Sequence, residues 1–349
     1  MKVIVACAGS SSRFPNMAPK WMLPDYDGQP MIRHAVSGLG VGVEDLIVTI
    51  LRDHDERFDA AAGLARAFGP KLTTVILDRP TGSQSETVAE TLKATGLAEP
   101  FLVKDSDNYF ELGGLDHPSN YVSVASLNDF DHINARNKSY VQIDQDDLIV
   151  NMREKQVISD LFSVGGYFFR SPAEFLAAYG ELSEVSRAQE LYLSNVIAFM
   201  ILNGHAFTAR RVGRYQDWGT IHEWRQKLEG RRVFMVSVDG FLFERGSSFF
   251  APKFEEVRAN PQAIETARAM AEGGNMLIYL SIRPPELEPL TRQQLSGAGL
   301  PDGQIIFGCG IAQWSLVTAG HSSLPFTTSH ALEVDPADPN LRDKLDLAG

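Results

Sequence analysis

Continuous apolar runs alternate with amphipathic stretches along the N-terminal part of the chain. An unbroken apolar run is typical of a strand buried on both faces of a parallel sheet, whereas apolar residues three and four positions apart indicate a helix. The alternation predicts an α/β fold with a mainly parallel, Rossmann-like sheet and helices on both of its faces. The predicted strands cover residues 2–8, 45–51, 72–77 and 100–110, and the predicted helices cover 30–39, 55–68 and 84–95.

The pattern changes after residue 110, where the extended segments become shorter and more polar. A hairpin joins its two strands antiparallel, so the sheet is expected to be mixed. The predicted elements are a hairpin over 138–155, a strand over 162–169, helices over 174–182 and 188–204, and extended segments over 207–212 and 214–220.

A second, smaller α/β domain is expected after Gly230, where a charged helix end and a glycine precede a fresh apolar run. A chain of 349 residues is also long for a single hydrophobic core. We therefore expect domains at 1–229 and 230–349. The strands predicted in the second domain cover 232–238, 275–282 and 304–308, and its helices cover 262–272 and 286–297.

The composition argues against several classes of protein, namely membrane-spanning, disulfide-rich, zinc-binding and nucleic-acid-binding ones. Hydrophobic residues make up 44% of the chain, but no apolar run approaches the roughly 20 residues of a membrane span, and the N-terminal run is short for a signal peptide. Two distant cysteines, Cys7 and Cys309, argue against a disulfide framework or a zinc site and favour a reducing cytoplasm. A net charge of −12 argues against a nucleic-acid surface but allows a local pocket for a small anion.

Small residues follow the first predicted strand and lead to a fixed positive charge at Arg13. Backbone N–H groups at such a turn can face an anion, and the arginine would add a full charge; a plain tight turn explains the small residues equally well. Ligands of parallel sheets bind at the carboxyl ends of the strands, where this segment and Asp105 to Asp107 both fall. The small residues are Ala8, Gly9, Ser10 and Ser11.

A series of motifs resembles the nucleotidyltransferases that make nucleoside-diphosphate sugars, in particular their capsular-polysaccharide branch. The series opens with "AGSSSRF" (8–14), "PKWML" (19–23) and "GQPMI" (28–32). It continues in the family's order with "TGSQSETV" (81–88), "VKDSDNYF" (103–110), "NKSYV" (137–141), "REKQVIS" (153–159), "GGYFF" (165–169), "ELYLSNVI" (190–197) and "YQDWGT" (215–220). The resemblance spans roughly residues 1–225, with Ser11 and Ser83 in place of family glycines.

This resemblance implies a GT-A-like fold and a Mg²⁺-dependent enzyme. The enzyme would transfer a nucleoside monophosphate from a nucleoside triphosphate, with CTP or UTP favoured, to a phosphorylated acceptor such as a sugar phosphate, and would release pyrophosphate. The product would serve capsule or surface polysaccharide synthesis. Mg²⁺ is usually held by one or two carboxylates and by the phosphates themselves.

The resemblance also implies roles for individual residues. Asp107 and Asp217 match the family's metal-binding aspartates, whereas Asp105 would make a water-mediated contact or simply belong to the turn. Arg13 would bind the departing phosphates, and Lys20 would lie against the α-phosphate. The remaining nucleotide-binding candidates are the backbone at Ala8 and Gly9 together with Ser10, Ser11, Gln84, Ser85 and Gly166.

The acceptor side rests on fewer residues. Lys155 resembles the family lysine that holds the acceptor phosphate, and Glu154 would orient that lysine or a sugar hydroxyl. An exposed ion pair in a hairpin explains the Glu154–Lys155 pair as well. Asn195 lies where relatives often carry an acid, which puts its acceptor contact in doubt.

The predicted second domain resembles the haloacid-dehalogenase superfamily at "VFMVSVDGFLF" and "YLSIRPPEL". The family's nucleophilic aspartate is replaced by Ser237, while Asp239, Gly240 and the phosphate-binding Ser281 remain. Serine is a poor nucleophile without a neighbouring base. We expect a phosphatase-like domain that has lost hydrolysis and serves packing or oligomerisation.

Two other functions stay open from the sequence. One is a non-catalytic scaffold that binds a nucleotide or a sugar phosphate, and the other is a haloacid-dehalogenase-type phosphatase. Homo-oligomerisation is also left open.

Overall fold

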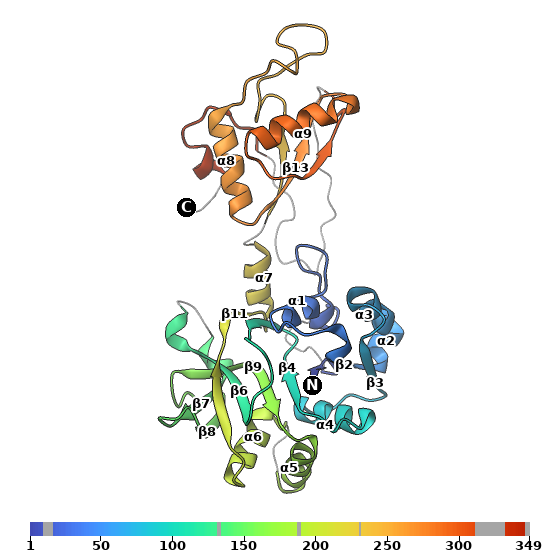
Figure 1. Cartoon of the computed structure of the whole chain (residues 1–349), viewed down its shortest axis with the longest axis vertical. Helices are drawn as coiled ribbons and strands as arrows, with labels where there is room; N and C mark the ends of the chain where they lie inside the picture. Colours follow the sequence, from blue (N-terminus) through green and yellow to red (C-terminus); the bar gives the residue numbers. More distant parts are fainter. Residues whose placement is uncertain (10–16, 131–133, 187–189, 230–231, 311–331, 346–349) are drawn as a thin grey trace. The chain divides into compact units, whose positions relative to one another are not determined.

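The structure is a computed structural model that describes residues 1–9, 17–130, 134–186, 190–229, 232–310 and 332–345. The chain divides into two compact units, Met1–Trp224 and Arg225–Gly349, which are described separately (Figure 1). The division falls within helix α7 (Ile221–Glu229), and the boundary expected from the sequence lies at the end of the same helix.

A nine-stranded mixed sheet forms the centre of the first unit, with β10-β6-β9-β4-β1-β2-β3 along its main path. The half from β4 to β3 is parallel, and β9 runs antiparallel between β4 and β6. A hairpin, β7 and β8, adds to the sheet through β9. The strands are β1 (Lys2–Ala6), β2 (Leu46–Leu51), β3 (Thr73–Leu77), β4 (Phe101–Lys104), β6 (Asn120–Ser126), β7 (Ser139–Ile143), β8 (Ile149–Glu154), β9 (Leu161–Phe169) and β10 (Phe207–Arg211).

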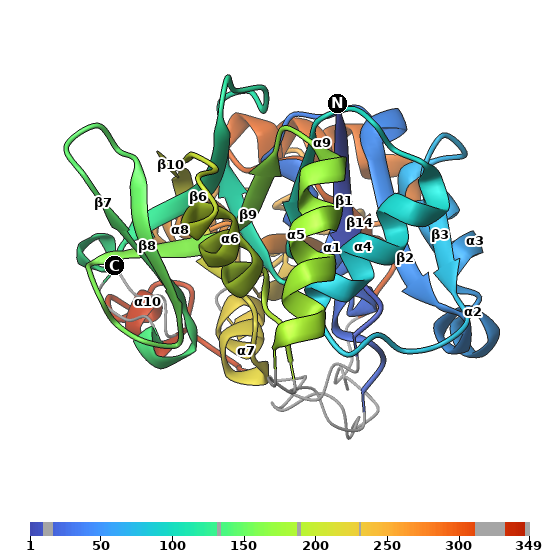
Figure 2. The same ribbon diagram turned by 90° about the horizontal axis from the view of Figure 1, so that it is seen from below.

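Helices cover both faces of this sheet, as the alternation along the sequence predicts (Figure 2). Successive side chains of a strand point to opposite faces. Val3 and Val5 of β1 therefore pack in one core cluster with α1 and α3, while Ile4 packs in the other with α4, α5 and α6. The helices are α1 (Met31–Ser37), α2 (Arg52–Phe58), α3 (Ala60–Phe68), α4 (Gln84–Thr95), α5 (Pro172–Val185) and α6 (Leu193–Leu202), with short 3-10 turns at η1 (Lys20–Met22), η2 (Val43–Asp45), η3 (Leu127–Asp129) and η4 (Ala135–Asn137).

Several elements differ from the sequence prediction. The helix expected over 55–68 is divided because Asp59 adopts φ 51, a left-handed conformation that ends α2 before α3 begins. The helix expected from 188 begins at Leu193, and residues 187–189 lie outside the described part of the chain. Strand β6 was not predicted, because its alternation of polar and apolar residues gives no continuous apolar run although every residue of it is buried.

The strand predicted over 100–110 also divides, and the division places an acidic turn between its two halves. The chain leaves the main sheet after Lys104 and turns through Asp105 to Asp107 before β5 (Asn108–Glu111) begins. β5 pairs antiparallel with β11 (Gly213–Asp217) in a separate two-stranded sheet. This pairing sets Asp217 opposite Asn108, next to the turn at the end of β4.

The second unit has a three-stranded parallel sheet in the order β12-β13-β14. Apolar residues of two helices pack on one face of it, with Ile264, Ala267 and Leu295 against Leu277 and Tyr279. This is the α/β alternation expected from the sequence, whereas the likeness to a haloacid dehalogenase stays a prediction. The elements are β12 (Val233–Ser237), α8 (Pro261–Glu272), β13 (Met276–Leu280), η5 (Pro285–Leu287), α9 (Glu288–Gly297), β14 (Gln304–Ile306) and α10 (Leu341–Lys344).

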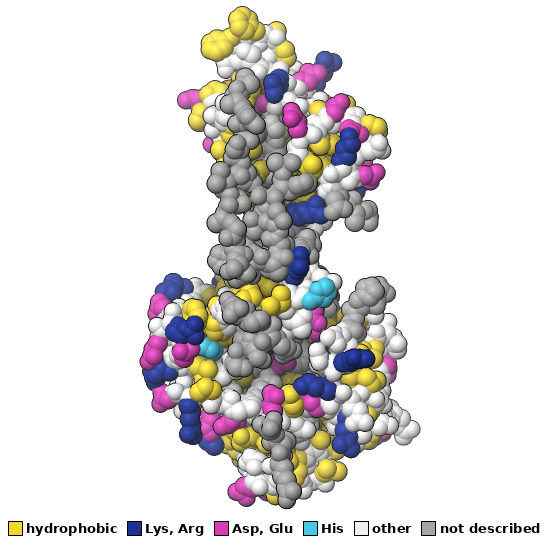
Figure 3. All heavy atoms as spheres, turned by 180° about the vertical axis from the view of Figure 1, so that it is seen from behind, with side chains coloured by type: hydrophobic (Ala, Val, Ile, Leu, Met, Phe, Trp, Pro, Cys, Tyr) yellow, Lys and Arg dark blue, Asp and Glu magenta, His cyan; other side chains and the backbone are white. Residues whose placement is uncertain are grey.

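The surface of the first unit mixes acidic and basic side chains on the face seen in Figure 3. Among the helices that the structure describes, none combines the length and the apolar character required to cross a bilayer.

Candidate active site

A cavity of about 420 Å³ opens at the carboxyl end of β4. Its wall is built by the β4–β5 turn, the β7–β8 hairpin, the start of α6 and the end of β11. Six residues that the sequence analysis singled out line this cavity, although they come from segments far apart in the chain. They are Gln84, Asp105, Asp107, Glu154, Lys155 and Asp217.

Asp107 is the last residue of the β4–β5 turn. Its side chain is mostly buried, and its Oδ2 is paired with the ammonium of Lys20 from η1. The backbone carbonyl of Asp107 accepts a hydrogen bond from the amide of Trp218 at 2.9 Å. That bond extends the β5–β11 pairing and brings Asp217, the neighbour of Trp218, to the same part of the cavity.

Asp217 has partners on both of its carboxylate oxygens. Oδ1 accepts a hydrogen bond from the amide of Gly219 at 3.0 Å, and Oδ2 is paired with the Nζ of Lys138. The same ammonium donates to the hydroxyl of Tyr215 at 2.8 Å. Burial, reinforced by the charge of Asp217, raises the pKa of Tyr215 far above its ordinary value, so that hydroxyl stays neutral beside the lysine.

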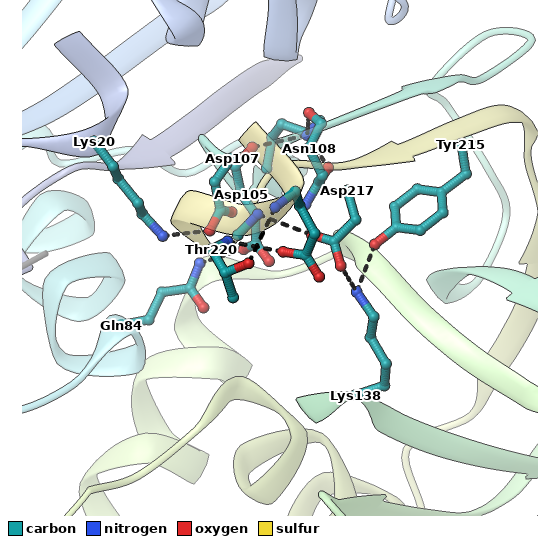
Figure 4. A network of polar contacts seen from close by, with 12 residues as sticks. Lys20, Gln84, Asp105, Asp107, Asn108, Lys138, Tyr215, Asp217 and Thr220 are labelled. Atoms are coloured by element: carbon teal, nitrogen blue, oxygen red, sulfur yellow. Dashed lines mark hydrogen bonds and ion pairs between the residues drawn. The ribbon is translucent and has the colours of Figure 1, made fainter. Parts of the chain in front are cut away.

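The two lysine–aspartate pairs approach the site from opposite sides, Lys20 toward Asp107 and Lys138 toward Asp217 (Figure 4). The sequence analysis assigned a role to Lys20 but missed Lys138. The motif "NKSYV" contains Lys138, but nothing in the local sequence indicates that its side chain meets a carboxylate 79 positions away.

Asp105 begins the same turn and also lines the cavity. Its Oδ1 accepts a hydrogen bond from the Nε2 of Gln84 at 2.6 Å. Burial, together with the negative charge of Asp107, raises the pKa of Asp105 to about 6. Gln84, expected to meet the base of a nucleotide, is thus engaged with the β4–β5 turn.

Lys104 is a second residue that the sequence analysis missed. Its side chain is fully buried, and its Nζ donates to the backbone oxygens of Asp105 at 2.7 Å and Asn108 at 2.9 Å. Burial lowers the pKa of Lys104 to about 8. The lysine therefore ties together the two ends of the turn that carries Asp107, and the available signal was a lysine within an otherwise apolar strand.

Glu154 and Lys155 have separate partners in the cavity. The Oε2 of Glu154 accepts hydrogen bonds from the hydroxyls of Ser139 and Ser194, the latter at 2.8 Å. The Nζ of Lys155 donates to the hydroxyl of Tyr192 at 2.7 Å, and this hydrogen bond raises the pKa of Lys155. The two side chains thus present a carboxylate with hydroxyls and an ammonium to the same space.

The other predicted site residues have different positions. Within the described part of the chain, the cavity wall includes neither Ser85, which is buried and donates to the carbonyl of Leu191, nor Asn195, whose Oδ1 accepts from the amide of Tyr192 at 3.0 Å and caps α6. Lys20 reaches the site through Asp107. Ala8 is buried and Gly9 exposed after β1, while Ser10, Ser11 and Arg13 lie outside the described residues.

Gly165, rather than the predicted Gly166, lines the cavity. A Cβ on Gly166 would lie 2.6 Å from atoms of Phe110 and Ser123, so this glycine is required by the packing of the sheet. Gly165 adopts φ +81, and its carbonyl accepts from the amide of Asp105 at 2.8 Å. The backbone at Gly165 in β9 therefore holds the first residue of the acidic turn.

The donor set fits Mg²⁺ held together with phosphate oxygens. Among the residues described, no three His, Cys, Asp or Glu side chains form a cluster that could hold a metal by themselves. Asp107 and Asp217 offer carboxylate oxygens in one cavity, and Mg²⁺ binds through one or two carboxylates when the phosphates of a substrate supply further ligands.

Comparison with known proteins gives a fold. No protein-family model matches the chain, and no curated protein matches it. Among solved structures, it is similar to a nucleoside-diphosphate-sugar pyrophosphorylase from Vibrio cholerae, with a TM-score of 0.55, 23% identity, and coverage of 66% of this chain and 100% of that one. The first unit has a nucleotidyltransferase fold.

Two further structures with this nucleotidyltransferase fold are similar to the chain. A putative glucose-1-phosphate thymidylyltransferase from Bacillus anthracis matches with a TM-score of 0.52 and 19% identity, covering 66% of this chain and 94% of its own. The inositol-1-phosphate CTP transferase from T. maritima matches with a TM-score of 0.51 and 13% identity, covering 64% of this chain and 90% of its own.

The second unit contains a separate polar centre at Asp239. The Oδ2 of Asp239 accepts from the hydroxyl of Ser281 at 2.7 Å, and its Oδ1 accepts from the Nε of Arg283 at 2.8 Å. Arg283 is fully buried and donates further to Thr291 and Gln294. The hydroxyl that the sequence analysis expected to bind a phosphate is therefore engaged with Asp239.

Proposed function

We propose that the first unit is a Mg²⁺-dependent nucleotidyltransferase. It transfers a nucleoside monophosphate from a nucleoside triphosphate, with CTP or UTP favoured, to a phosphorylated acceptor such as a sugar phosphate. The observation that carries this proposal is the convergence of Asp107 and Asp217 on one cavity that also contains Lys155 and receives Lys20 through Asp107. Support comes from the similar solved proteins, which are named as a pyrophosphorylase, a thymidylyltransferase and a CTP transferase.

The reaction needs positioning and charge neutralisation more than proton transfer. An oxygen of the acceptor phosphate attacks the α-phosphorus, the bond from the α-phosphorus to the bridging oxygen breaks, and pyrophosphate leaves with both electrons of that bond. The acceptor phosphate is already anionic, so no protein base is required. A bound Mg²⁺ would neutralise phosphate charge, and Lys20 would stabilise charge that develops at the α-phosphate.

The acceptor side of the cavity favours a phosphorylated polyhydroxy compound. Lys155 supplies a positive charge for the acceptor phosphate, and Tyr192 holds its ammonium. Glu154, with Ser139 and Ser194, supplies carboxylate and hydroxyl groups that can bond sugar hydroxyls. A sugar phosphate activated in this way is a building block for capsule or surface polysaccharide, which is the role we propose.

We propose that the second unit does not hydrolyse phosphate and has a packing or oligomerising role. Both carboxylate oxygens of Asp239 have partners within the unit, and one partner is a fully buried arginine. Ser237, at the position of the family nucleophile, donates to the backbone oxygen of Asp239 at 3.0 Å. An acid held in this way is poorly placed to exchange protons with a substrate.

A pyrophosphate-release assay tests the proposed function. The full chain is incubated with MgCl₂, each of ATP, CTP, GTP and UTP, and a panel of phosphorylated sugars and polyols. Release of pyrophosphate with one triphosphate and one acceptor supports the proposal. Binding of a triphosphate without release across the panel would instead favour a scaffold, and release of inorganic phosphate that Asp239→Ala abolishes would favour a phosphatase.

A further inference from the structure

The Lys138–Asp217 pair occupies one of the two carboxylates assigned to the metal. The side chains of Lys138 and Asp217 are only 10% and 19% exposed. The ammonium lies 5.3 Å from the ring centre of Tyr215 and 5.7 Å from that of Phe162, besides its hydrogen bond to the Tyr215 hydroxyl. Aromatic and polar groups thus hold the lysine against Asp217.

This arrangement sets a lysine and a divalent cation in competition. Both oxygens of Asp217 already accept from donors, so a cation that binds this carboxylate comes close to the ammonium of Lys138. Two positive charges beside one carboxylate repel each other, and the repulsion is strong where solvent is largely excluded. Asp107 has a lysine partner as well, and the charge of Lys20 further lowers the affinity of the cavity for a free cation.

A nucleoside triphosphate offsets the repulsion between the Lys138 ammonium and the cation, because it brings several negative charges to the same space. With those charges present, an ammonium and a divalent cation can both be neutralised. Lys138 also stays beside the acceptor subsite, since its backbone carbonyl accepts from the amide of Lys155 at 2.9 Å.

We propose that Lys138 guards Asp217 against free divalent cations, so that the metal is bound only together with the triphosphate. This inference rests on the nucleotidyltransferase function proposed above. Lys138 is a positioning residue in this account, because it acts on the metal site through Asp217. The consequence is an ordered substrate-binding step, in which the protein without nucleotide has low affinity for Mg²⁺.

Metal binding without nucleotide tests the inference. Mn²⁺ serves as the probe, and its free concentration is followed by electron paramagnetic resonance while it is added to the full chain without any substrate. Lys138→Met, which keeps the length of the side chain but removes the charge, is expected to bind Mn²⁺ about 10- to 100-fold more tightly than the unmodified protein. Lys138→Gln replaces it if the methionine variant does not fold by circular dichroism.

The matched control is Lys155→Met, which removes the same charge from the same cavity. The native Lys155 donates to Tyr192 rather than to a carboxylate proposed to bind the metal. Its Mn²⁺ affinity is expected to stay within about threefold of the unmodified protein. In an Asp217→Asn background, Lys138→Met is expected to have no effect on Mn²⁺ affinity. Equal tightening by both lysine variants, or no tightening by Lys138→Met, overturns the proposal.

Separate measurements distinguish this inference from the proposed function. Pyrophosphate release by the unmodified protein reports the function, whereas Mn²⁺ affinity without nucleotide reports the guarding role. Turnover with no difference in Mn²⁺ affinity between the unmodified protein and Lys138→Met contradicts the inference alone. Tighter Mn²⁺ binding by Lys138→Met in a chain that releases no pyrophosphate contradicts the function alone.

Discussion

Gly165 and the carboxylate of Asp105 lie so close together that there is no room for a side chain at position 165. A Cβ there would be 2.3 Å from the Oδ2 of Asp105 and 2.6 Å from the Nδ2 of Asn108. Asp105 cannot easily move away, because Gln84 and the backbone at Gly165 both hold it. The acidic turn is therefore shaped by a glycine on a neighbouring strand as much as by its own sequence.

Gly165→Ala is expected to lower the free energy of unfolding of the first unit by about 2 kcal/mol or more, since the φ of +81 and the contact with Asp105 both oppose a Cβ. Pyrophosphate release should fall with it, because the turn that carries Asp107 must shift. Thermal unfolding and the release assay measure the two effects. The control is Gly180→Ala in α5, where a Cβ meets nothing within 4 Å and the helix should be unchanged or slightly more stable. Equal stability of the two variants would show that the turn adapts freely.

Asp107→Asn is expected to reduce pyrophosphate release by about 100-fold or more, since it removes a negative charge from the proposed metal site. The fold should persist, because the loss of the Lys20 ion pair is offset by relief of the repulsion between Asp107 and Asp105. Steady-state kinetics and circular dichroism measure these effects. Asp78→Asn is the control, since Asp78 is largely exposed and pairs with Arg52 away from the cavity. Unchanged kinetics in Asp107→Asn would remove this residue from the metal site.

Cys7 is expected to resist alkylation in the folded protein. Burial raises the pKa of its thiol to about 12, and a raised pKa leaves less thiolate at any given pH. At pH 8, iodoacetamide should therefore modify the partly exposed Cys309 first and Cys7 only after unfolding, as followed by mass spectrometry of the peptides. Modification of both thiols in denaturant is the control. Equal rates at the two cysteines in the native protein would contradict the enclosed position of Cys7 after β1.

Arg283→Met is expected to destabilise the second unit by about 3–5 kcal/mol, because it leaves the buried carboxylate of Asp239 without its charged partner. Asp239→Asn combined with Arg283→Met should recover part of that loss. Hydrogen exchange of peptides from β12 and β13 measures the local stability. No difference between the single and the double variant would mean that the ion pair is not coupled. Pyrophosphate release by the first unit provides an independent check that the first unit remains folded.

The β1 to β4 half of the large sheet could be predicted from the sequence, because its strands appear as apolar runs. β1, β2 and β4 are largely buried on both faces, whereas β3 at the edge of the sheet is only partly buried. β6 could not, since Ser123 and the other polar residues of this buried strand interrupt its apolar pattern. The division of α2 from α3 depends on the backbone of the single residue Asp59, which no periodicity records.

The sequence analysis singled out the residues of the candidate site that lie in local motifs, and their functional roles stay predictions. Asp107 and Asp217 each lie in a recognisable motif, and the structure brings both to one cavity. Lys104, Lys138 and Gly165 were missed because their roles come from partners supplied by other segments. A lysine in a sequence gives no sign of whether it faces solvent or a carboxylate, and only the pairing of β5 with β11 decides it here.

The β5–β11 ladder also determines when this site can exist during synthesis of the protein. Asp107 leaves the ribosome well before β11, the strand that carries Asp217. A nascent chain that has completed β1 to β9 therefore contains Asp107 but lacks Asp217, the other carboxylate proposed to bind the metal. The two carboxylates come together only after β11 has been translated and has paired with β5, so the proposed site forms late in the synthesis of the first unit.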